Sequence, residues 1–420
     1  MKSSRRNFIS TTIAGGLGAS LSASGISGQG GTAAVPDYSK FDAIISQPVL
    51  KREQFKTPII IDTLDLLRYK DSFICRVRSK DGAEGLSVGN SLQLPSLYPI
   101  LVLRLKPFFI GKDARNLDTL LEEVYVYNSN YKLQSLALWV PLATIEFAIL
   151  DMLGKIGNRS IGQLIGEIHN PEVAVYSANS DRNITVEETM ARIQKQVEVS
   201  KAKAIKLKVG GRMSAPETPP GRTEKLIPMV RKVYGDKMVL YADSNGSYGV
   251  EDAIRIGRIM EAHNYAFYEE PVPFDWYEET RQVTDALTIP VAGGEQEASL
   301  HAFRWLIANN ALDIVQPDMF YFGGMIRSMK VARMAEAAGK ICTPHISGED
   351  LGYVYMMHFI SAIPNAGPFH EFKGFDQDMP VSSKTSSLKS NDGKFKVPTG
   401  PGLGVDVDPG YITKHKVVQM

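Results

Sequence analysis

Three apolar segments in the second half of the 420-residue chain each end on a carboxylate, and this repetition constrains the fold more than any other feature. The acids are Asp243, Glu269 and Glu295, and successive acids are 26 residues apart. A parallel α/β fold repeats one strand and one helix, so successive units bring successive strand ends side by side. We therefore expect three neighbouring strands that end at one edge, each on an acid.

Short β-rich runs alternate with helical stretches from about residue 172 onward. The predicted strands are 173–179, 204–210, 238–245, 266–272, 289–295, 312–318, 339–345 and 368–372. Eight strands with intervening helices fit a (β/α)₈-type, TIM-like barrel of the α/β class. An open doubly wound sheet is the alternative. We favour the barrel because no glycine-rich nucleotide turn follows the first strand, and because polar residues end nearly every strand.

In a barrel, the carboxyl ends of the strands share one mouth, where the chemistry is placed. Three carboxylates at that mouth would repel one another and raise one another's pKa unless a divalent cation lies between them. Oxygen ligands select Mg²⁺, with Mn²⁺ and Ca²⁺ as the other candidates. The alternative is that the acids are unrelated caps of helix N-termini, which three acids in register argue against. The sequence predicts a magnesium site formed by Asp243, Glu269 and Glu295.

The second predicted strand carries two lysines, Lys206 and Lys208. Residues two apart on a strand point to the same side, so both lysines would face into the barrel. Desolvation and a neighbouring ammonium both lower the pKa of a lysine, which would make a usable base. The alternative is an edge strand with solvated lysines, but the flanking Ile205, Leu207 and Val209 predict a packed strand.

The sixth strand ends in Asp318 and the seventh in His345. Adjacent strand ends place these side chains within reach, and a carboxylate that accepts from one imidazole nitrogen raises the basicity of the other. Taken alone, His345 is more typical of a structural histidine. On the eighth strand Glu371 is expected to face the substrate as a protonated or hydrogen-bonding acid, rather than as a further metal ligand.

The predicted mouth therefore has bases on two flanks of a metal. Strands two and seven lie on different sides of the ring, so a lysine and the histidine would face each other across the substrate. That arrangement fits abstraction of a proton next to a carboxylate, with the metal and Glu371 stabilising the enediolate that results.

The ordered set of motifs resembles the enolase superfamily, and within it the mandelate racemase/muconate lactonizing enzyme family, mandelate racemase subgroup. The motifs are KLK (206–208), DSN (243–245), EEP (269–271), GGE (293–295), QPD (316–318), TPH (343–345) and HEF (370–372). The resemblance implies that Asp243, Glu269 and Glu295 bind Mg²⁺. It implies Lys208 as one acid/base, assisted by Lys206. The resemblance also implies that His345, oriented by Asp318, is the second acid/base and that Glu371 is the electrophile.

Three segments depart from the usual pattern of this family. The connection 209–225 is long and rich in Pro, Gly and Arg, which predicts a loop over the mouth. The stretch from His345 to Glu371 is also extended. The first predicted hairpin, 64–77, is short, which would leave a wide pocket for a polyhydroxylated substrate. Candidate substrate-binding residues are therefore Asn245, Arg68 and Lys70, although ordinary solvated turn residues explain Arg68 and Lys70 equally well.

The chain divides into four predicted parts. Residues 1–36 form an export signal and linker, and residues 37–165 form an α+β capping domain with strands before helices. Residues 166–395 form the barrel, and residues 396–420 are expected to return to the cap, as the resemblance implies.

The N-terminus resembles a twin-arginine export signal, with Arg5 and Arg6 before a Gly/Ala/Ser-rich run. The alternative is an unstructured tail with two arginines by chance. We expect a periplasmic protein without a lipid anchor, since no cysteine follows that run.

The formal net charge of +1 gives no indication of a nucleic-acid or membrane partner. Cys75 and Cys342 are predicted to be buried thiols.

The first functional hypothesis is an exported, Mg²⁺-dependent acid-sugar dehydratase that forms a 2-keto-3-deoxy acid. The second is a racemase, epimerase or cycloisomerase with the same site, because the same residues would abstract the proton. A third is a non-catalytic receptor for carboxylates or sugars, against which the bases on both flanks argue. The family resemblance also implies a homo-oligomer and a small-molecule carboxylate sugar as the substrate.

Overall fold

The computed structural model describes residues 36–348, 351–374 and 380–420. The predicted export signal, apart from the last residue of its linker, lies outside the described residues.

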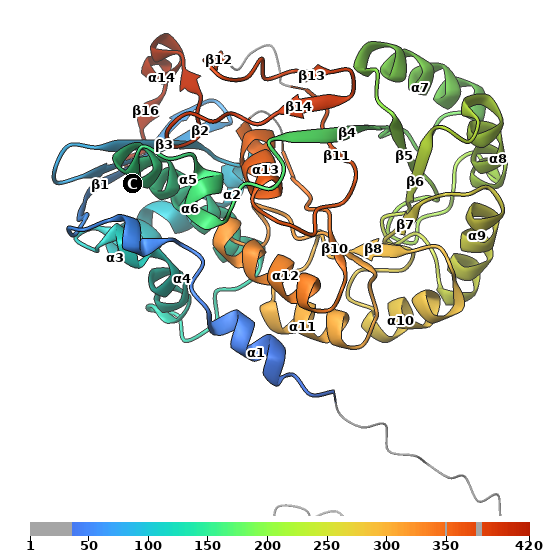
Figure 1. Ribbon diagram of the computed structural model, residues 1–420, viewed down its shortest axis with the longest axis horizontal. Helices are drawn as coiled ribbons and strands as arrows, with labels where there is room; N and C mark the ends of the chain where they lie inside the picture. The colour runs from blue at the N-terminus through green and yellow to red at the C-terminus, as the bar shows by residue number, and fades with distance from the viewer. Residues whose placement is uncertain (1–35, 349–350, 375–379) are drawn as a thin grey trace, which may run out of the picture. The chain divides into compact units, whose positions relative to one another are not determined.

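Eight parallel strands form the ring that the alternating pattern predicts (Figure 1). The strands are β4 (Glu172–Ala178), β5 (Ala204–Lys208), β6 (Val239–Asp243), β7 (Phe267–Glu269), β8 (Val291–Gly293), β9 (Ile314–Val315), β10 (Ile341–Cys342) and β11 (His370–Glu371). Consecutive strands pair from β4 to β10, and β11 pairs with β4. A bridge between Cys342 and Ala366 joins β10 to the segment that leads into β11. The predicted (β/α)₈-type barrel is confirmed.

Helices cover the outside of the ring, as Figure 1 shows. They are α7 (Val186–Ser200), α8 (Arg222–Tyr234), α9 (Val250–Ala262), α10 (Tyr277–Ala286), α11 (Leu300–Ala308), α12 (Met325–Ala337) and α13 (Leu351–Ser361). Local sequence determines where they begin: Thr185 and Glu188 form a reciprocal capping box at the start of α7. The buried residues of α9 lie three, four and seven positions after Ala253, which turns one apolar face toward the strands.

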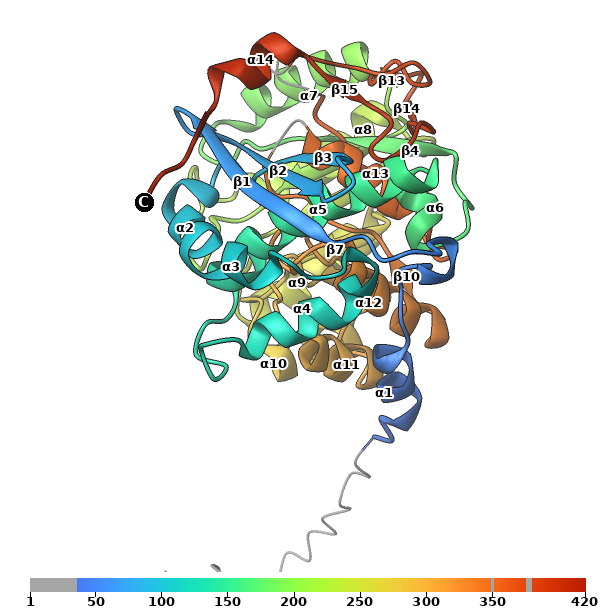
Figure 2. The same cartoon turned by 90° about the vertical axis from the view of Figure 1, so that its left-hand side faces the viewer.

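The N-terminal cap contains an antiparallel meander of three strands, β1 (Ile61–Tyr69), β2 (Ser72–Ser79) and β3 (Glu84–Val88). Helical segments complete it: α1 (Ser39–Ser46), η1 (Arg52–Gln54), α2 (Leu94–Ile100), η2 (Leu101–Leu105), α3 (Lys106–Phe109), η3 (Ala114–Asn116), α4 (Leu117–Val126), α5 (Leu136–Gly157) and α6 (Ile161–Ile165). Figure 2 views the cap from the side of β1 and β2.

The C-terminal segment adds strands to the barrel sheet and to the cap sheet. Its elements are β12 (Val381–Ser382), β13 (Ser390–Asn391), β14 (Lys394–Lys396), β15 (Asp406–Val407), α14 (Pro409–Lys414) and β16 (Lys416–Val417). Strand β14 pairs antiparallel with β4 of the barrel. Strand β16 pairs antiparallel with β1, so the end of the chain lies at the edge of the cap sheet (Figure 2).

Helix α5 connects the cap with the barrel. It is long and apolar enough to cross a membrane, but 89% of its most apolar window is buried inside the structure, as expected for a core helix. Its Glu146 accepts hydrogen bonds from the backbone N–H groups of Met325 and Ile326, at 2.8 Å each, at the start of α12. Its Asp151 accepts from the N–H of Leu86 at the same distance, which attaches β3 to the helix.

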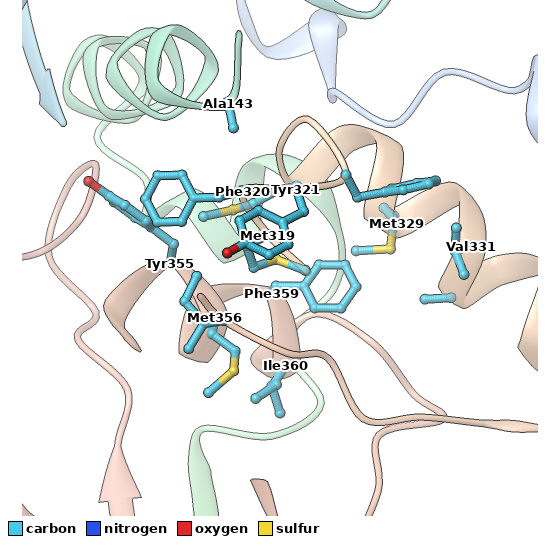
Figure 3. Close-up of a cluster of buried hydrophobic side chains, with 14 of the residues drawn as sticks. Ala143, Met319, Phe320, Tyr321, Met329, Val331, Tyr355, Met356, Phe359 and Ile360 are labelled. Carbon is cyan, nitrogen blue, oxygen red and sulfur yellow. The ribbon is translucent and has the colours of Figure 1, made fainter. Parts of the chain in front are cut away.

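Aromatic and methionine side chains fill the space between α5, α12 and α13. Figure 3 shows the rings of Phe320 and Tyr355 next to each other within this cluster, and their centroids are 6.0 Å apart. The Tyr355 ring stacks on Phe147 of α5, with ring centroids 4.0 Å apart. Each fully buried side chain of this size contributes about 1.5–3 kcal/mol to the free energy of unfolding, because its apolar surface is removed from water. This core supports the segment that follows β9, which carries Asp318.

Candidate active site

The three predicted metal ligands converge at the carboxyl ends of their strands. Asp243 and Glu269 are the last residues of β6 and β7 and lie opposite each other in the parallel register. Glu295 follows β8 by two residues. One carboxylate oxygen from each residue lies within 4.8 Å of the others, and all three residues are buried. Asn245 and Gly246 both have positive φ, so the chain turns sharply after Asp243 and leaves its carboxylate at the strand end.

The charges of these acids are uneven. Burial disfavours the Asp243 carboxylate, but Lys208 and Lys206 outweigh that effect and lower its pKa. Burial raises the pKa of Glu269 to about 7, with Lys206 opposing that shift and Asp243 and Glu295 adding to it. Three buried carboxylate oxygens that face one another form a hard, oxygen-only donor set. That donor set fits a divalent cation such as Mg²⁺.

The two lysines of β5 have different surroundings. Lys206 is buried and donates to both carboxylate oxygens of Glu269, at 2.8 and 2.9 Å. Burial disfavours its ammonium, but Glu269 and further neighbours raise its pKa well above the ordinary value. The expectation that Lys206 has a lowered pKa is therefore wrong, because opposite charges surround it more closely than the like charge. Lys208 is the more exposed of the two, at 20%, and donates to Asp243 and to the Asn245 Oδ1 at 3.0 Å.

His345 and Asp318 form a close pair. Asp318 Oδ2 lies 2.6 Å from His345 Nδ1, and the other ring nitrogen, Nε2, lies 3.3 Å from Glu295 Oε2. Burial favours the neutral imidazole, but Glu295 and Asp318 outweigh it and raise the pKa of His345 to about 9. The imidazole is therefore protonated near neutral pH in the metal-free protein, with Nε2 directed at the acid cluster.

The two candidate bases lie on different flanks of the acids. In the ring, β6, β7 and β8 carry the acids, β5 on one side carries Lys208, and His345 follows β10 on the other side. A ligand held at the acid cluster would therefore have a lysine on one flank and a histidine on the other.

Glu371 was expected to be a protonated or hydrogen-bonding acid, and it accepts hydrogen bonds but is not protonated. Its Oε1 lies 2.7 Å from Lys373 Nζ, and its Oε2 lies 3.4 Å from Lys206 Nζ and 3.3 Å from the Tyr176 hydroxyl, which donates to it. Burial disfavours the carboxylate, but Lys206 and Lys373 together hold the pKa of Glu371 well below its usual range. Glu371 is therefore an ionised acceptor in this structure rather than a donor.

Several residues of the site are absent from the sequence-based prediction. Arg182, in the loop after β4, donates to the backbone oxygen of Asp243 at 3.3 Å and to the Asn245 Oδ1 at 2.5 Å. Glu270 is buried with positive φ, and its Oε1 has no hydrogen-bond partner within the described part of the chain. Burial and neighbouring acids raise its pKa well above normal. The EEP motif contained a signal for Glu270, because two consecutive acids follow one buried strand. Nothing in the local sequence marks Arg182.

The predicted substrate-binding residues lie in different places. Asn245 lies inside the site, and its Nδ2 donates to Glu270 at 3.3 Å. Arg68 and Lys70 lie at the turn between β1 and β2. Arg68 packs over the Phe73 and Tyr98 rings of the cap. Among the described residues, no hydrogen bond or ion pair joins either side chain to the acid cluster, so the structure does not bring them together with it.

The connection from β5 to α8 follows the rim beside β6; residues 222–225 of the predicted loop 209–225 belong to α8. The Met213 N–H donates to the backbone oxygen of Asn245 at 2.9 Å, and the Ser214 N–H donates to the backbone oxygen of Gly246 at 3.1 Å. Both residues have positive φ, and the Met213 side chain is exposed. The loop is thus attached to the turn that carries Asn245.

Comparison with known proteins places these features in a family context. The profile of the family described as "Enolase C-terminal domain-like" matches residues 188–411, which is more than half of the chain. The chain is 24% identical to arabinonate dehydratase of Saccharolobus solfataricus over 74% of this chain and 81% of that protein. It is 25% identical to D-galactarolactone cycloisomerase of Agrobacterium fabrum over 74% of this chain and 82% of that protein.

A solved structure has the same fold. It is a mandelate racemase/muconate lactonizing protein from Paracoccus denitrificans PD1222, complexed with magnesium. The TM-score is 0.76 at 24% identity, over 86% of this chain and 99% of that chain.

Proposed function

The chain belongs to the enolase C-terminal domain-like family, and from that premise we propose that it is a Mg²⁺-dependent acid-sugar dehydratase. One observation carries the proposal: the buried triad of Asp243, Glu269 and Glu295 lies between strands that position Lys208 and His345 on opposite flanks. A receptor for carboxylates would need the triad but neither base. The relative named arabinonate dehydratase supports an acid-sugar substrate.

The triad would hold the cation, which when bound would polarise the substrate's carboxylate and neutralise charge that develops on it. Lys208, in its neutral form, takes the proton from the carbon next to that carboxylate. Lys206 remains a buried cation between Glu269 and Glu371 and adds positive charge beneath the site.

His345 supplies the second proton transfer. A proton on Nε2 passes to the departing β-hydroxyl, which leaves as water. Asp318 holds Nδ1 and stabilises the imidazolium before transfer. The enol product then tautomerises to a 2-keto-3-deoxy acid.

An isomerase with the same site is the second candidate. The relative named D-galactarolactone cycloisomerase favours it, since both activities occur among similar proteins. The same base would abstract the proton, and the residue on the opposite flank would return a proton to carbon instead of protonating a leaving hydroxyl. The presence of a leaving group beside the abstracted proton would decide between the outcomes.

Export to the periplasm through a twin-arginine route is part of the proposal, and Arg5 and Arg6 motivate it. Export in the folded state would suit a protein that takes up its metal first. A homo-oligomer is proposed from the family resemblance alone.

The test is a screen of purified protein with Mg²⁺ against mono- and diacid sugars, scored for 2-keto acid formation and for epimeric or cyclised products. Formation of a 2-keto acid from at least one sugar would support the dehydratase. Isomerised product alone would favour the second candidate. Saturable binding without any product would contradict both and favour a receptor.

A further inference from the structure

One side chain of the cap reaches the His345–Asp318 pair through hydrogen bonds. Asn90, in the loop after β3, donates to Ser347, which follows His345 by two residues. We propose that Asn90 is a positioning residue of the site: by donating to the hydroxyl oxygen of Ser347, it directs the hydroxyl proton toward Asp318. The inference rests on the proposed function, in which Asp318 orients His345.

The orientation of the Asn90 amide is determined by backbone groups. Its Oδ1 accepts from the N–H groups of Leu92 and Gln93, at 3.0 and 2.8 Å. Its Nδ2 donates to the backbone oxygen of Ser347 at 3.0 Å. A backbone N–H can only donate and a carbonyl can only accept, so the amide has one allowed orientation.

That orientation fixes the Ser347 hydroxyl. Asn90 Nδ2 also lies 2.9 Å from Ser347 Oγ, and because an amide nitrogen is a donor only, Oγ must accept there. The single hydroxyl proton is then free to point the other way, where Asp318 Oδ1 lies 3.1 Å from Oγ. The hydroxyl therefore cannot donate to Asn90, and the Asp318 carboxylate is the charged acceptor within hydrogen-bond distance of it.

The carboxylate of Asp318 is surrounded by donors on both oxygens. Oδ1 accepts from the N–H groups of Phe320 and Tyr321, at 2.7 and 2.8 Å, as well as from the Ser347 hydroxyl. Oδ2 accepts from the Ser347 N–H at 2.5 Å and from His345 Nδ1 at 2.6 Å. Each donor draws charge from the carboxylate and holds its plane, so loss of the hydroxyl bond leaves more charge for the bond to His345.

The cap therefore completes the surroundings of a barrel carboxylate. Asn90 and Ser347 are 257 residues apart in the chain, and Asn90, Ser347 and Asp318 are all buried. Asn90 also begins the turn into α2, since its Oδ1 accepts from the first residues after it. Correct docking of the cap thereby sets the direction of one hydrogen bond at the dyad.

The experiment measures the side-chain nitrogen chemical shifts of His345 by NMR, in protein carrying isotope-labelled histidine at fixed pH and without metal. The chain has seven histidines. The resonances that disappear in the His345→Asn variant are thereby assigned to His345. The variants are Ser347→Ala, Asn90→Ala and the double variant. Asn90→Asp is a further variant that keeps the Oδ1 acceptor for Leu92 and Gln93, in case Asn90→Ala does not fold.

Tyr355→Phe is the matched control. The Tyr355 hydroxyl accepts from the Val88 N–H at 2.7 Å and so also joins the barrel to the cap, but it does not contact Asp318. Its loss should lower the melting temperature and leave the His345 ring-nitrogen shifts at their wild-type values.

We expect Asn90→Ala, Asn90→Asp and Ser347→Ala each to move the His345 Nδ1 shift in the same direction, toward a stronger hydrogen bond. In the double variant Asn90→Ala should add nothing to Ser347→Ala, because Asn90 acts through that hydroxyl. Wild-type shifts in the Asn90 variants, additive effects in the double variant, or an equal shift in Tyr355→Phe would overturn the inference. These outcomes do not depend on turnover, so failure of the proposed function would appear separately, as absence of product in the sugar screen.

Discussion

Asp318 and His345 lie opposite each other in a parallel β-bridge that extends β9 and β10, and this pairing places Asp318 Oδ2 2.6 Å from His345 Nδ1. The backbone itself sets the contact: the His345 N–H donates to the Pro317 oxygen at 3.1 Å, and the Met319 N–H donates to the His345 oxygen at 3.2 Å. Nδ1 is thereby held by Asp318, and Nε2 is the nitrogen that faces the acid cluster.

Asp318→Asn should therefore reduce turnover and also lower the stability of the fold, because its amide NH₂ must face backbone N–H groups that donate to the wild-type carboxylate. The amide preserves the shape but removes the charge that stabilises the imidazolium, so kcat should fall by about 10²- to 10⁴-fold, as is typical of general acid–base groups. Steady-state kinetics on a substrate from the sugar screen would measure this, with KM expected to change little. A kcat close to wild type would show that His345 does not depend on Asp318.

Metal removal should abolish turnover reversibly. Dialysis against EDTA should remove activity, and added Mg²⁺ should restore it. Glu269→Gln removes one hard anionic ligand and should prevent that restoration, while circular dichroism should report an intact fold. Glu297→Gln is the matched control, because Glu297 is also buried near β8 but accepts from the Ala298 and Ser299 N–H groups and from Tyr277. Full turnover in a verified metal-free preparation would contradict a metal site.

His358 should make the fold sensitive to acid. It is fully buried on α13, with Nε2 2.9 Å from the Leu403 oxygen, and burial lowers its pKa to about 4 from 6.5. A histidine with a lowered folded-state pKa is protonated more readily in the unfolded chain. Its contribution to the free energy of unfolding is therefore complete above pH 6.5 and is lost as the pH falls toward 4. The shift corresponds to roughly 3 kcal/mol at most.

His358→Gln tests this directly, because a glutamine amide can still donate to the Leu403 oxygen but does not titrate. The free energy of unfolding, measured by urea denaturation between pH 7 and about pH 4, should fall less steeply in the variant than in wild type. The exposed His301→Gln should keep the wild-type slope. Equal slopes for His358→Gln and wild type would contradict the assignment.

The twin-arginine proposal has its own test. Replacing Arg5 and Arg6 with lysines keeps the positive charge but removes the paired arginines that the export route reads. The protein should then remain in the cytoplasm, as measured by cell fractionation and immunoblotting. Unchanged recovery from the periplasm would count against this route.

The sequence was sufficient to predict the barrel and the convergence of the acids, because both follow from strand periodicity. Asp243 and Glu269 end neighbouring parallel strands, and parallel register brings such residues together wherever the barrel closes. The Asp318–His345 pair was predictable for the same reason.

Charge states were not predictable, because they depend on which side chains meet. Lys206 was expected to be influenced by Lys208, yet its closest partners are the two oxygens of Glu269. Glu371 was expected to be protonated or hydrogen-bonding, and its ionised form could not be told in advance, because it depends on Lys373, which lies 2.7 Å from it. The link from Asn90 could not be predicted either, since it depends on how cap and barrel pack.

The central claim is that Lys208 and His345 face the substrate from opposite flanks and transfer different protons, and hydrogen exchange in D₂O tests it most directly. A substrate from the sugar screen, incubated with enzyme and Mg²⁺, would be analysed by NMR for deuterium next to the carboxylate and for 2-keto acid. With Lys208 as the abstracting base, His345→Asn should stop water loss and retain deuterium exchange, and Lys208→Ala should stop both. Each lost step should slow by about 10²- to 10⁴-fold. If His345 abstracts instead, the two phenotypes exchange. Near wild-type turnover in both single variants, or no deuterium exchange in any variant or substrate, would contradict the two-base mechanism.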